Sequence, residues 1–211
     1  MCDFDGTITM QDTAEWILDK HADGDWRVLD ELYVQGKIGL LECMSQQFSM
    51  VRLGDEQLLK ELDEAISIRS GFPEMVDAFR AAGGDVLIVS AGLDFVIDHY
   101  MKRLGVSSKV KVYSSRTHRV DGHISFEFPP LTYRESKSFK DDVVRQWQSK
   151  GAVVTYIGDG TPDAEACALA DYRFAVHGSK LEAIMDARKL KHVSFESFVA
   201  IIPQILKSEC L

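Results

Sequence analysis

The chain opens with the sequence MCDFDGT at residues 1–7, and this stretch decides how the rest is interpreted. Two carboxylates, Asp3 and Asp5, lie two positions apart at the end of a short predicted strand. Gly6 then permits a tight turn, and Thr7 supplies a hydroxyl that can bind an anion. Ligands of open α/β sheets bind at the carboxyl ends of strands, so both acids can converge on one ligand there. Two such anions about 4 Å apart repel by about 4 kcal/mol at an effective dielectric constant of about 20, so a divalent cation or a proton must compensate.

Composition narrows the class of protein. The 211 residues, 45% hydrophobic and 27% charged, predict a globular domain with a small insertion. The formal net charge of −9, without a stripe rich in Lys and Arg, excludes a nucleic-acid partner. No apolar run reaches the roughly 18 residues of a membrane span, so we expect a cytoplasmic protein without a membrane partner. The cysteines form no CxxC pair and are expected to be reduced: Cys2, Cys43, Cys167 and Cys210.

The first strand is unusually short in apolar residues, because only Met1 and Cys2 precede Asp3. Buried parallel strands usually offer about four to six such residues. Either this strand is very short or the true start lies upstream.

Residues 12–70 show helical spacing throughout, in four segments separated by Gly36, Gly39 and Gly54. No strand pattern interrupts them. We therefore expect an all-helical cap domain at residues 12–70, inserted into a core domain of residues 1–11 and 71–211. The Trp and Met residues at helical spacing are expected to be packed in its core.

Strands alternate with helices after residue 71. Buried strands are predicted at residues 86–89 and 153–157, and further strands at residues 109–113, 174–176 and 192–195. Helices are predicted at residues 74–82, 95–104, 138–150, 164–170, 181–187 and 198–206. Alternation around Asp121-Gly122 predicts a β-hairpin over residues 116–128. This order indicates an α/β fold, a doubly wound parallel sheet with right-handed crossovers.

Two further polar sites lie at the ends of predicted strands or the starts of helices. Ser90-Ala91-Gly92 follows a buried strand and can form an anion cradle, although a simple helix cap explains the same residues. Lys140 begins a helix, where a cation opposes the macrodipole by about 0.3–1 kcal/mol. Binding an anion would account for this position, and a solvated side chain is the alternative. Lys137 competes for the role, but the apolar helical pattern starts directly after Lys140.

The loop GDGTPD at residues 158–163 follows the predicted strand VVTYI. Asp159 and Asp163 have no Lys or Arg beside them in this loop, so together they need a cation. Oxygen ligands with room for water suit Mg²⁺ better than zinc or a calcium cage. Asp163 alone is equally explained as a helix cap.

These segments resemble, in order, the four motifs of the haloacid dehalogenase (HAD) superfamily, most of whose members are phosphatases: DFDGT, the Ser90 turn, the Lys140 helix start and GDGTPD. The resemblance covers the sheet domain and implies a HAD-like Rossmannoid fold. Residues 12–70 are similar to the helical cap of the phosphoserine phosphatase type.

The resemblance also implies roles for individual residues. Asp3 would be the nucleophile that forms an aspartyl-phosphate, and Asp5 the general acid and base. The phosphoryl oxygens would be held by Thr7, Ser90, Ala91, Gly92 and Lys140. Mg²⁺ would be bound by the carboxylates of Asp3 and Asp159 and by the backbone carbonyl of Asp5. Asp163 would not bind the metal directly but would lie next to these ligands. The expected activity is Mg²⁺-dependent hydrolysis of a small-molecule phosphomonoester, by a monomer or homodimer.

The resemblance points to two different substrate classes, one within each of two HAD subfamilies. In phosphoserine phosphatases a cap carboxylate reads the amino group, and Asp12 is the candidate for that role. A cap arginine reads the carboxylate, but residues 46–48 are Gln-Gln-Phe here, and Arg52 is the nearest substitute. The cap and the segment GDGTPDAEAC look closer to the methionine-salvage phosphatases that act on hydroxy-keto-methylthiopentenyl phosphate.

Two rival functions use similar residues. A phosphorelay receiver domain also has a phosphorylated aspartate, Mg²⁺, a hydroxyl and a lysine, but it lacks a helical insertion and an acid two residues after the nucleophile. Sugar-phosphate mutases and phosphotransferases share the HAD motifs and return the phosphoryl group to substrate.

Overall fold

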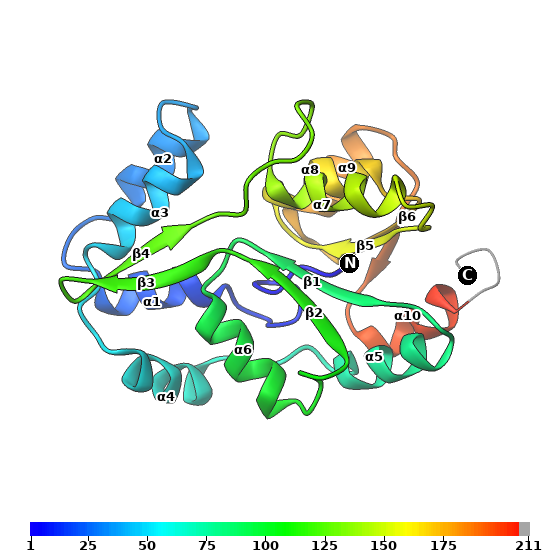
Figure 1. The fold of residues 1–211 in the computed structure, drawn as a ribbon, viewed down its shortest axis with the longest axis horizontal. Coiled ribbons are helices and arrows are strands. Elements are labelled where there is room, and N and C mark those ends of the chain that lie inside the picture. Colours follow the sequence, from blue (N-terminus) through cyan, green and yellow to red (C-terminus); the bar gives the residue numbers. More distant parts are fainter. Residues whose placement is uncertain (207–211) are drawn as a thin grey trace.

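The computed structural model describes residues 1–206, and their arrangement is shown in Figure 1. One parallel sheet runs through the molecule. Its strands are β1 (Val86–Ser90), β2 (Val110–Ser114), β5 (Thr155–Gly158), β6 (Tyr172–Val176) and β7 (Val193–Phe195). β1 pairs with β2, and β6 pairs with both β5 and β7.

The first residues of the chain join the two halves of this sheet. Cys2 forms parallel bridges to Ile88 on one side and Ile157 on the other. The Asp3 N–H donates to the Ile157 carbonyl at 2.9 Å, and the chain leaves the sheet directly afterwards. Within residues 1–206 the central strand is represented by Cys2 alone, which is bridged to a neighbouring strand on each side.

Helices cover both faces of the sheet (Figure 1). One face carries α5 (Phe72–Ala81), α6 (Asp94–Arg103) and α10 (Phe198–Ile205). The other carries α7 (Phe139–Gln148), α8 (Ala164–Leu169) and α9 (Lys180–Ala187). All five residues of β1 are buried, because apolar helices lie against both of its faces. The prediction of a doubly wound α/β fold is confirmed.

A helical block interrupts the fold after the first loop, also as expected. It contains α1 (Thr13–His21), α2 (Arg27–Val34), α3 (Leu40–Phe48) and α4 (Asp55–Ala65). In Figure 1 the blue and cyan helices α1, α2 and α3 gather at the end of the molecule away from β6.

The predicted hairpin is present but lies against this helical block. β3 (Arg116–Val120) pairs antiparallel with β4 (His123–Glu127). Phe126 of β4 packs on Phe48 of α3, with ring centroids 5.2 Å apart. Arg119 of β3 donates to the Leu53 carbonyl at 2.6 Å. The sequence assigned the hairpin to the core domain on chain order alone, and chain order does not report this packing.

The chain enters and leaves the helical block through two adjacent segments, residues 8–10 and 67–69, which we call the linker ribbon. Thr9 and Ile68 form an antiparallel bridge. The Arg69 N–H donates to the Ile8 carbonyl at 2.8 Å, which extends the same pairing. The linker ribbon therefore places residue 69 beside the loop that contains Asp5. No helix within residues 1–206 is both long and apolar enough to cross a membrane.

Candidate active site

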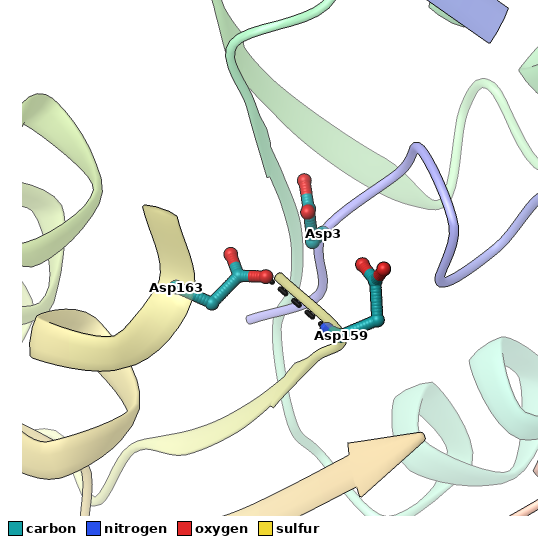
Figure 2. Close-up of side chains that lie close together, drawn as sticks. All are labelled: Asp3, Asp159 and Asp163. Carbon is teal, nitrogen blue, oxygen red and sulfur yellow. Dashed lines mark hydrogen bonds between the residues drawn. The ribbon is translucent and has the colours of Figure 1, made fainter. Parts of the chain in front are cut away.

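Three aspartates meet at the carboxyl edge of the sheet, as Figure 2 shows. Asp3 follows the central bridged residue, whereas Asp159 and Asp163 come from the loop and short helical turn after β5. One carboxylate oxygen from each lies within 4.8 Å of the other two. Asp163 is fully buried and Asp3 nearly so. The two segments that the sequence singled out are therefore brought together by the parallel arrangement of their strands.

A buried lysine lies among these acids. Lys140 Nζ is 2.9 Å from Asp3 Oδ1 and 2.7 Å from Asp163 Oδ1, and the residue is 3% exposed. Burial by itself lowers the pKa of Lys140, but the charges of Asp163 and Asp3 outweigh it and raise the pKa above its ordinary value. The ammonium therefore stays charged. Lys137, the alternative, instead pairs with Glu165 at 3.0 Å on the exposed side.

Both carboxylate oxygens of Asp163 accept hydrogen bonds. Oδ1 accepts from the Tyr156 hydroxyl at 2.8 Å as well as from Lys140. Oδ2 accepts from the backbone N–H groups of Asp159 at 3.2 Å and Gly160 at 3.0 Å. Burial raises the pKa of Asp163, but Lys140 and these donors outweigh it and hold the pKa below its ordinary value. Asp163 therefore anchors both the lysine and the 158–163 loop.

The negative charges of Asp3 and Asp159 are less fully offset by hydrogen-bond donors and positive charge than that of Asp163. Burial, then the charge of Asp163, raises the pKa of Asp3 well above its ordinary value, although Lys140 opposes this. The same two causes raise the pKa of Asp159 to about 6. One ammonium faces three carboxylates, so Asp3 and Asp159 favour an additional positive charge. Clustered carboxylate oxygens are the ligands that hard divalent cations prefer, and the cluster is suited to bind a metal ion.

Gly6 lies directly against Asp159. Its φ is +71°, in the left-handed region, and a Cβ built there would lie 2.3 Å from Asp159 Oδ2. Thr7, the next residue, donates its hydroxyl to Asp159 Oδ1 at 2.9 Å. Only glycine satisfies both the turn and the close approach.

Asp5 faces the start of the helical block. Its Oδ1 accepts from the Thr13 N–H at 2.9 Å and from the Thr13 hydroxyl at 2.6 Å. Burial, followed by the charge of Asp12, raises the pKa of Asp5 to about 7. A carboxyl with this pKa can both donate and accept a proton near neutral pH. Thr13 was not predicted as a site residue; its only sequence signal is its place one residue after Asp12, at the start of a helix.

The Ser90-Ala91-Gly92 turn lies beside Asp5. Ser90 is buried, and its Oγ accepts from the Gly92 N–H at 3.0 Å. A Cβ built on Gly92 would lie 2.3 Å from Asp5 Oδ2, so the carboxylate of Asp5 lies against the backbone of this turn. Ser115 Oγ donates to the Gly92 carbonyl at 2.7 Å and fixes the turn from the other side.

The two residues suggested for substrate reading lie in different places. Asp12 caps α1 by accepting from the Glu15 N–H at 2.9 Å, and its charge acts on Asp5. Arg52 is exposed and lies 3.5 Å from His123 Nε2, on the hairpin. The structure thus places Asp12 at the start of α1, where its charge acts on Asp5, and places Arg52 beside β4.

Arg69 is a further residue that the sequence did not indicate. It is 7% exposed, and its guanidinium donates to the carbonyls of Thr7 at 2.7 Å, Gly6 at 2.8 Å and Glu196 at 3.1 Å. In the sequence it is a single arginine before Ser70-Gly71, without a motif.

The carboxyl edge of a parallel α/β sheet thus gathers three acids and one buried lysine, next to a helical insertion. The sequence profile of haloacid dehalogenase-like hydrolases matches residues 1–167, more than half of the chain. The chain belongs to this family, and the resemblance found in the sequence is confirmed.

Curated relatives carry the name of a phosphatase. The 2-hydroxy-3-keto-5-methylthiopentenyl-1-phosphate phosphatase of Bacillus pumilus is 25% identical over an alignment of 211 residues, gaps included. The alignment spans 96% of this chain and 88% of that protein. The protein of the same name from Brevibacillus brevis is 27% identical over 206 residues, which cover 95% and 91%. The expectation of an enzyme of the hydrolase class is confirmed.

Solved structures share the fold. A HAD family hydrolase from Salmonella enterica serovar Typhi superimposes with a TM-score of 0.75 at 15% identity, covering 98% of this chain and 70% of that one. A phospho-aspartyl intermediate analogue of phosphoserine phosphatase gives a TM-score of 0.70 at 18% identity and covers 96% of both chains.

Proposed function

We propose that this protein is a Mg²⁺-dependent phosphatase that hydrolyses a small-molecule phosphomonoester through an aspartyl-phosphate on Asp3. The observation that carries the proposal is the position of Lys140 between Asp3 and Asp163, next to Asp159. Asp3 Oδ1 is held by Lys140 and by the Phe4 N–H at 2.8 Å, which orients the second oxygen for attack. A phosphate dianion can approach these acids only if positive charge offsets them.

The metal ligands in this proposal are Asp3, the Asp5 carbonyl and Asp159, with Asp163 holding the loop behind them. Mg²⁺ bound there supplies positive charge to the phosphoryl oxygens. Lys140 Nζ, the Ser90 and Thr7 hydroxyls and the N–H groups of Ala91 and Gly92 hold the remaining phosphoryl oxygens. Ser90 Oγ accepts from the Gly92 N–H, which leaves its O–H able to donate to a phosphoryl oxygen. The Thr7 hydroxyl donates to Asp159 and would have to turn to reach the phosphoryl group.

The reaction then proceeds in two displacements at phosphorus. An oxygen of Asp3 forms a bond to phosphorus while the bond to the leaving oxygen breaks, and Asp5 gives its proton to that oxygen. Asp5, now ionised, takes a proton from water, whose oxygen attacks the aspartyl-phosphate and releases Asp3 and phosphate. The pKa of Asp5, about 7, suits both transfers.

The substrate that we propose is the methylthiopentenyl phosphate named for the curated relatives. Phosphoserine is less favoured because no arginine stands at residues 46–48. Gln47, at the centre of that segment, is buried and donates to the Trp26 carbonyl at 3.4 Å, so it supports the packing of the helices. Arg52 lies beside His123. Our proposed division keeps residues 1–11 and 71–211 as the core domain and residues 12–70 as its cap. The hairpin belongs to the core range in sequence but packs against the cap.

The decisive experiment is a phosphate-release assay against a panel of phosphomonoesters, with Mg²⁺ or with EDTA. We expect Mg²⁺-dependent release from p-nitrophenyl phosphate, and faster release from the methylthiopentenyl phosphate than from phosphoserine. Phosphoprotein that accumulates without turnover would identify a receiver domain. Transfer within a hexose phosphate without net release would identify a mutase. Either result contradicts the proposal.

A further inference from the structure

Arg69 carries a buried charge without a buried carboxylate bonded to it. All the hydrogen bonds that its guanidinium forms within residues 1–206 go to backbone carbonyls: those of Gly6, Thr7 and Glu196. Burying a cation in this way costs free energy that neutral carbonyls offset only in part. Burial accordingly lowers the pKa of Arg69, while the nearby charge of Asp159 opposes this shift. A leucine or methionine at this position would avoid burying a charge but would leave these carbonyls without their donor.

Two of the three carbonyls that Arg69 binds, those of Gly6 and Thr7, belong to residues in contact with Asp159. Gly6 packs so closely on Asp159 that a Cβ there would lie 2.3 Å from its Oδ2. Thr7 donates its hydroxyl to Asp159 Oδ1 at 2.9 Å. Because the guanidinium is planar and donates in fixed directions, two bonds to successive carbonyls fix both peptide planes. Arg69 therefore fixes the backbone of the turn whose residues contact Asp159.

Arg69 is itself fixed by the linker ribbon. Its N–H donates to the Ile8 carbonyl at 2.8 Å, and its guanidinium lies 5.9 Å from the Phe195 ring centroid. One residue thus connects the segment that returns from the helical block, the end of the sheet at β7 and the turn after Asp5.

We propose that Arg69 is a positioning residue that holds the Gly6–Thr7 turn against Asp159 and thereby sets the affinity of the acidic cluster for Mg²⁺. This rests on the proposed function, because it takes the cluster to be the metal site. Without the guanidinium the two carbonyls lose their donors, the turn relaxes, and Asp159 loses both its close neighbour Gly6 and the Thr7 hydroxyl. Groups that orient metal ligands in this way typically change metal affinity by about 10–100-fold.

The experiment measures Mg²⁺ binding by calorimetry on the substrate-free protein, so that it does not depend on turnover. Arg69→Met is expected to bind Mg²⁺ at least about tenfold more weakly than the parent. Arg69→Lys, which keeps the charge but cannot span three carbonyls, is expected to fall between them. The control is Arg80→Met, because Arg80 also donates to a backbone carbonyl, that of Gly84, but lies at the opposite edge of the sheet. It should bind Mg²⁺ as the parent does.

Rescue by free guanidinium separates positioning from general damage. Adding millimolar guanidinium to Arg69→Ala should restore part of the Mg²⁺ affinity, and it should leave Arg80→Met unchanged. Parent-like Mg²⁺ affinity in folded Arg69→Met would overturn the proposal, as would a parent that binds no Mg²⁺. If Arg69→Met does not fold, parent-like affinity in Arg69→Lys overturns it instead. Phosphate release by the parent is measured separately, so a protein that binds Mg²⁺ but releases no phosphate refutes the proposed function and not the role of Arg69.

Discussion

Thr13 donates twice to the same oxygen of Asp5, through its hydroxyl at 2.6 Å and its backbone N–H at 2.9 Å. Thr13 begins α1, the first helix of the inserted block, whereas Asp5 lies in the loop that leaves the sheet. The acid that we assign to proton transfer is therefore bound to the segment that enters the insertion. Any movement of α1 relative to the sheet changes the hydrogen bonds of Asp5.

Thr13→Val tests this relationship. The hydrogen bond from the Thr13 hydroxyl lowers the pKa of Asp5, which burial has raised to about 7. Removing it raises the pKa further, so the limb of the pH–rate profile that reports Asp5 should move to higher pH. Thr13→Ser keeps a hydroxyl and should leave that limb in place. A profile of kcat/KM against pH for the three proteins checks the prediction, and identical limbs in all three would count against it.

Gly6→Ala should lower both stability and Mg²⁺ affinity. The left-handed backbone at φ +71° disfavours alanine by about 1–2 kcal/mol, and the new Cβ would also meet Asp159 Oδ2 at 2.3 Å. Gly36 is a matched control, because its φ is +70° but a Cβ there meets nothing within 4 Å. Urea unfolding of Gly6→Ala and Gly36→Ala isolates the effect of the contact. Equal losses in the two variants would show that Asp159 tolerates the methyl group.

Lys140→Met should destabilise the protein by about 3–5 kcal/mol at pH 7, because it leaves buried carboxylates without their partner. In the parent the pKa of Asp163 is held low, so its pairing stabilises the fold above the ordinary aspartate pKa and is lost as pH falls. In the variant the unpaired acids instead favour protonation. The difference in unfolding free energy should therefore grow between about pH 4 and pH 7.

Lys137→Met is the control for this measurement, since Lys137 forms an exposed pair with Glu165. Exposed pairs contribute about 0–1 kcal/mol, so its effect should be small. A difference for Lys140→Met that is constant across this pH range would mean that its partners are not the ionised acids.

Added Mg²⁺ should raise the melting temperature of the parent but not that of Asp159→Asn. A ligand present at about 100 times its Kd stabilises the folded state by about 2.7 kcal/mol. The pKa of Asp159 is about 6, so protons compete with the metal below that pH. The Mg²⁺-induced shift should therefore shrink as the pH falls through about 6. Thermal melts with and without Mg²⁺ at several pH values test this, and an undiminished shift at low pH would place the metal elsewhere.

The sequence was sufficient to predict site residues where charged side chains directly follow predicted strands. Asp159 follows the buried strand β5 and Asp3 follows the bridged residue Cys2, and parallel pairing brings these two positions to one edge of the sheet. Lys140 was preferred to Lys137 because the apolar pattern starts directly after it, and the structure buries Lys140 between Asp3 and Asp163.

The sequence was insufficient where a contact joins segments far apart in the chain. Arg69 reaches carbonyls of Gly6 and Thr7, and a backbone carbonyl leaves no trace in side-chain identity. The hairpin packs on α3 through Phe126 and Phe48, which are ordinary core residues in a local pattern. Such pairings depend on the assembled fold, and local periodicity does not encode them.

The central claim is that Asp3 attacks phosphorus while Asp5 moves the proton. The most direct test incubates Asp5→Asn with p-nitrophenyl phosphate and Mg²⁺, quenches in acid and maps the phosphorylated peptide by mass spectrometry. The account predicts a phosphoryl group on Asp3 in Asp5→Asn and none in Asp3→Asn, which should also lack turnover. Phosphorylation of another residue, or parent-like turnover in Asp3→Asn, would contradict it.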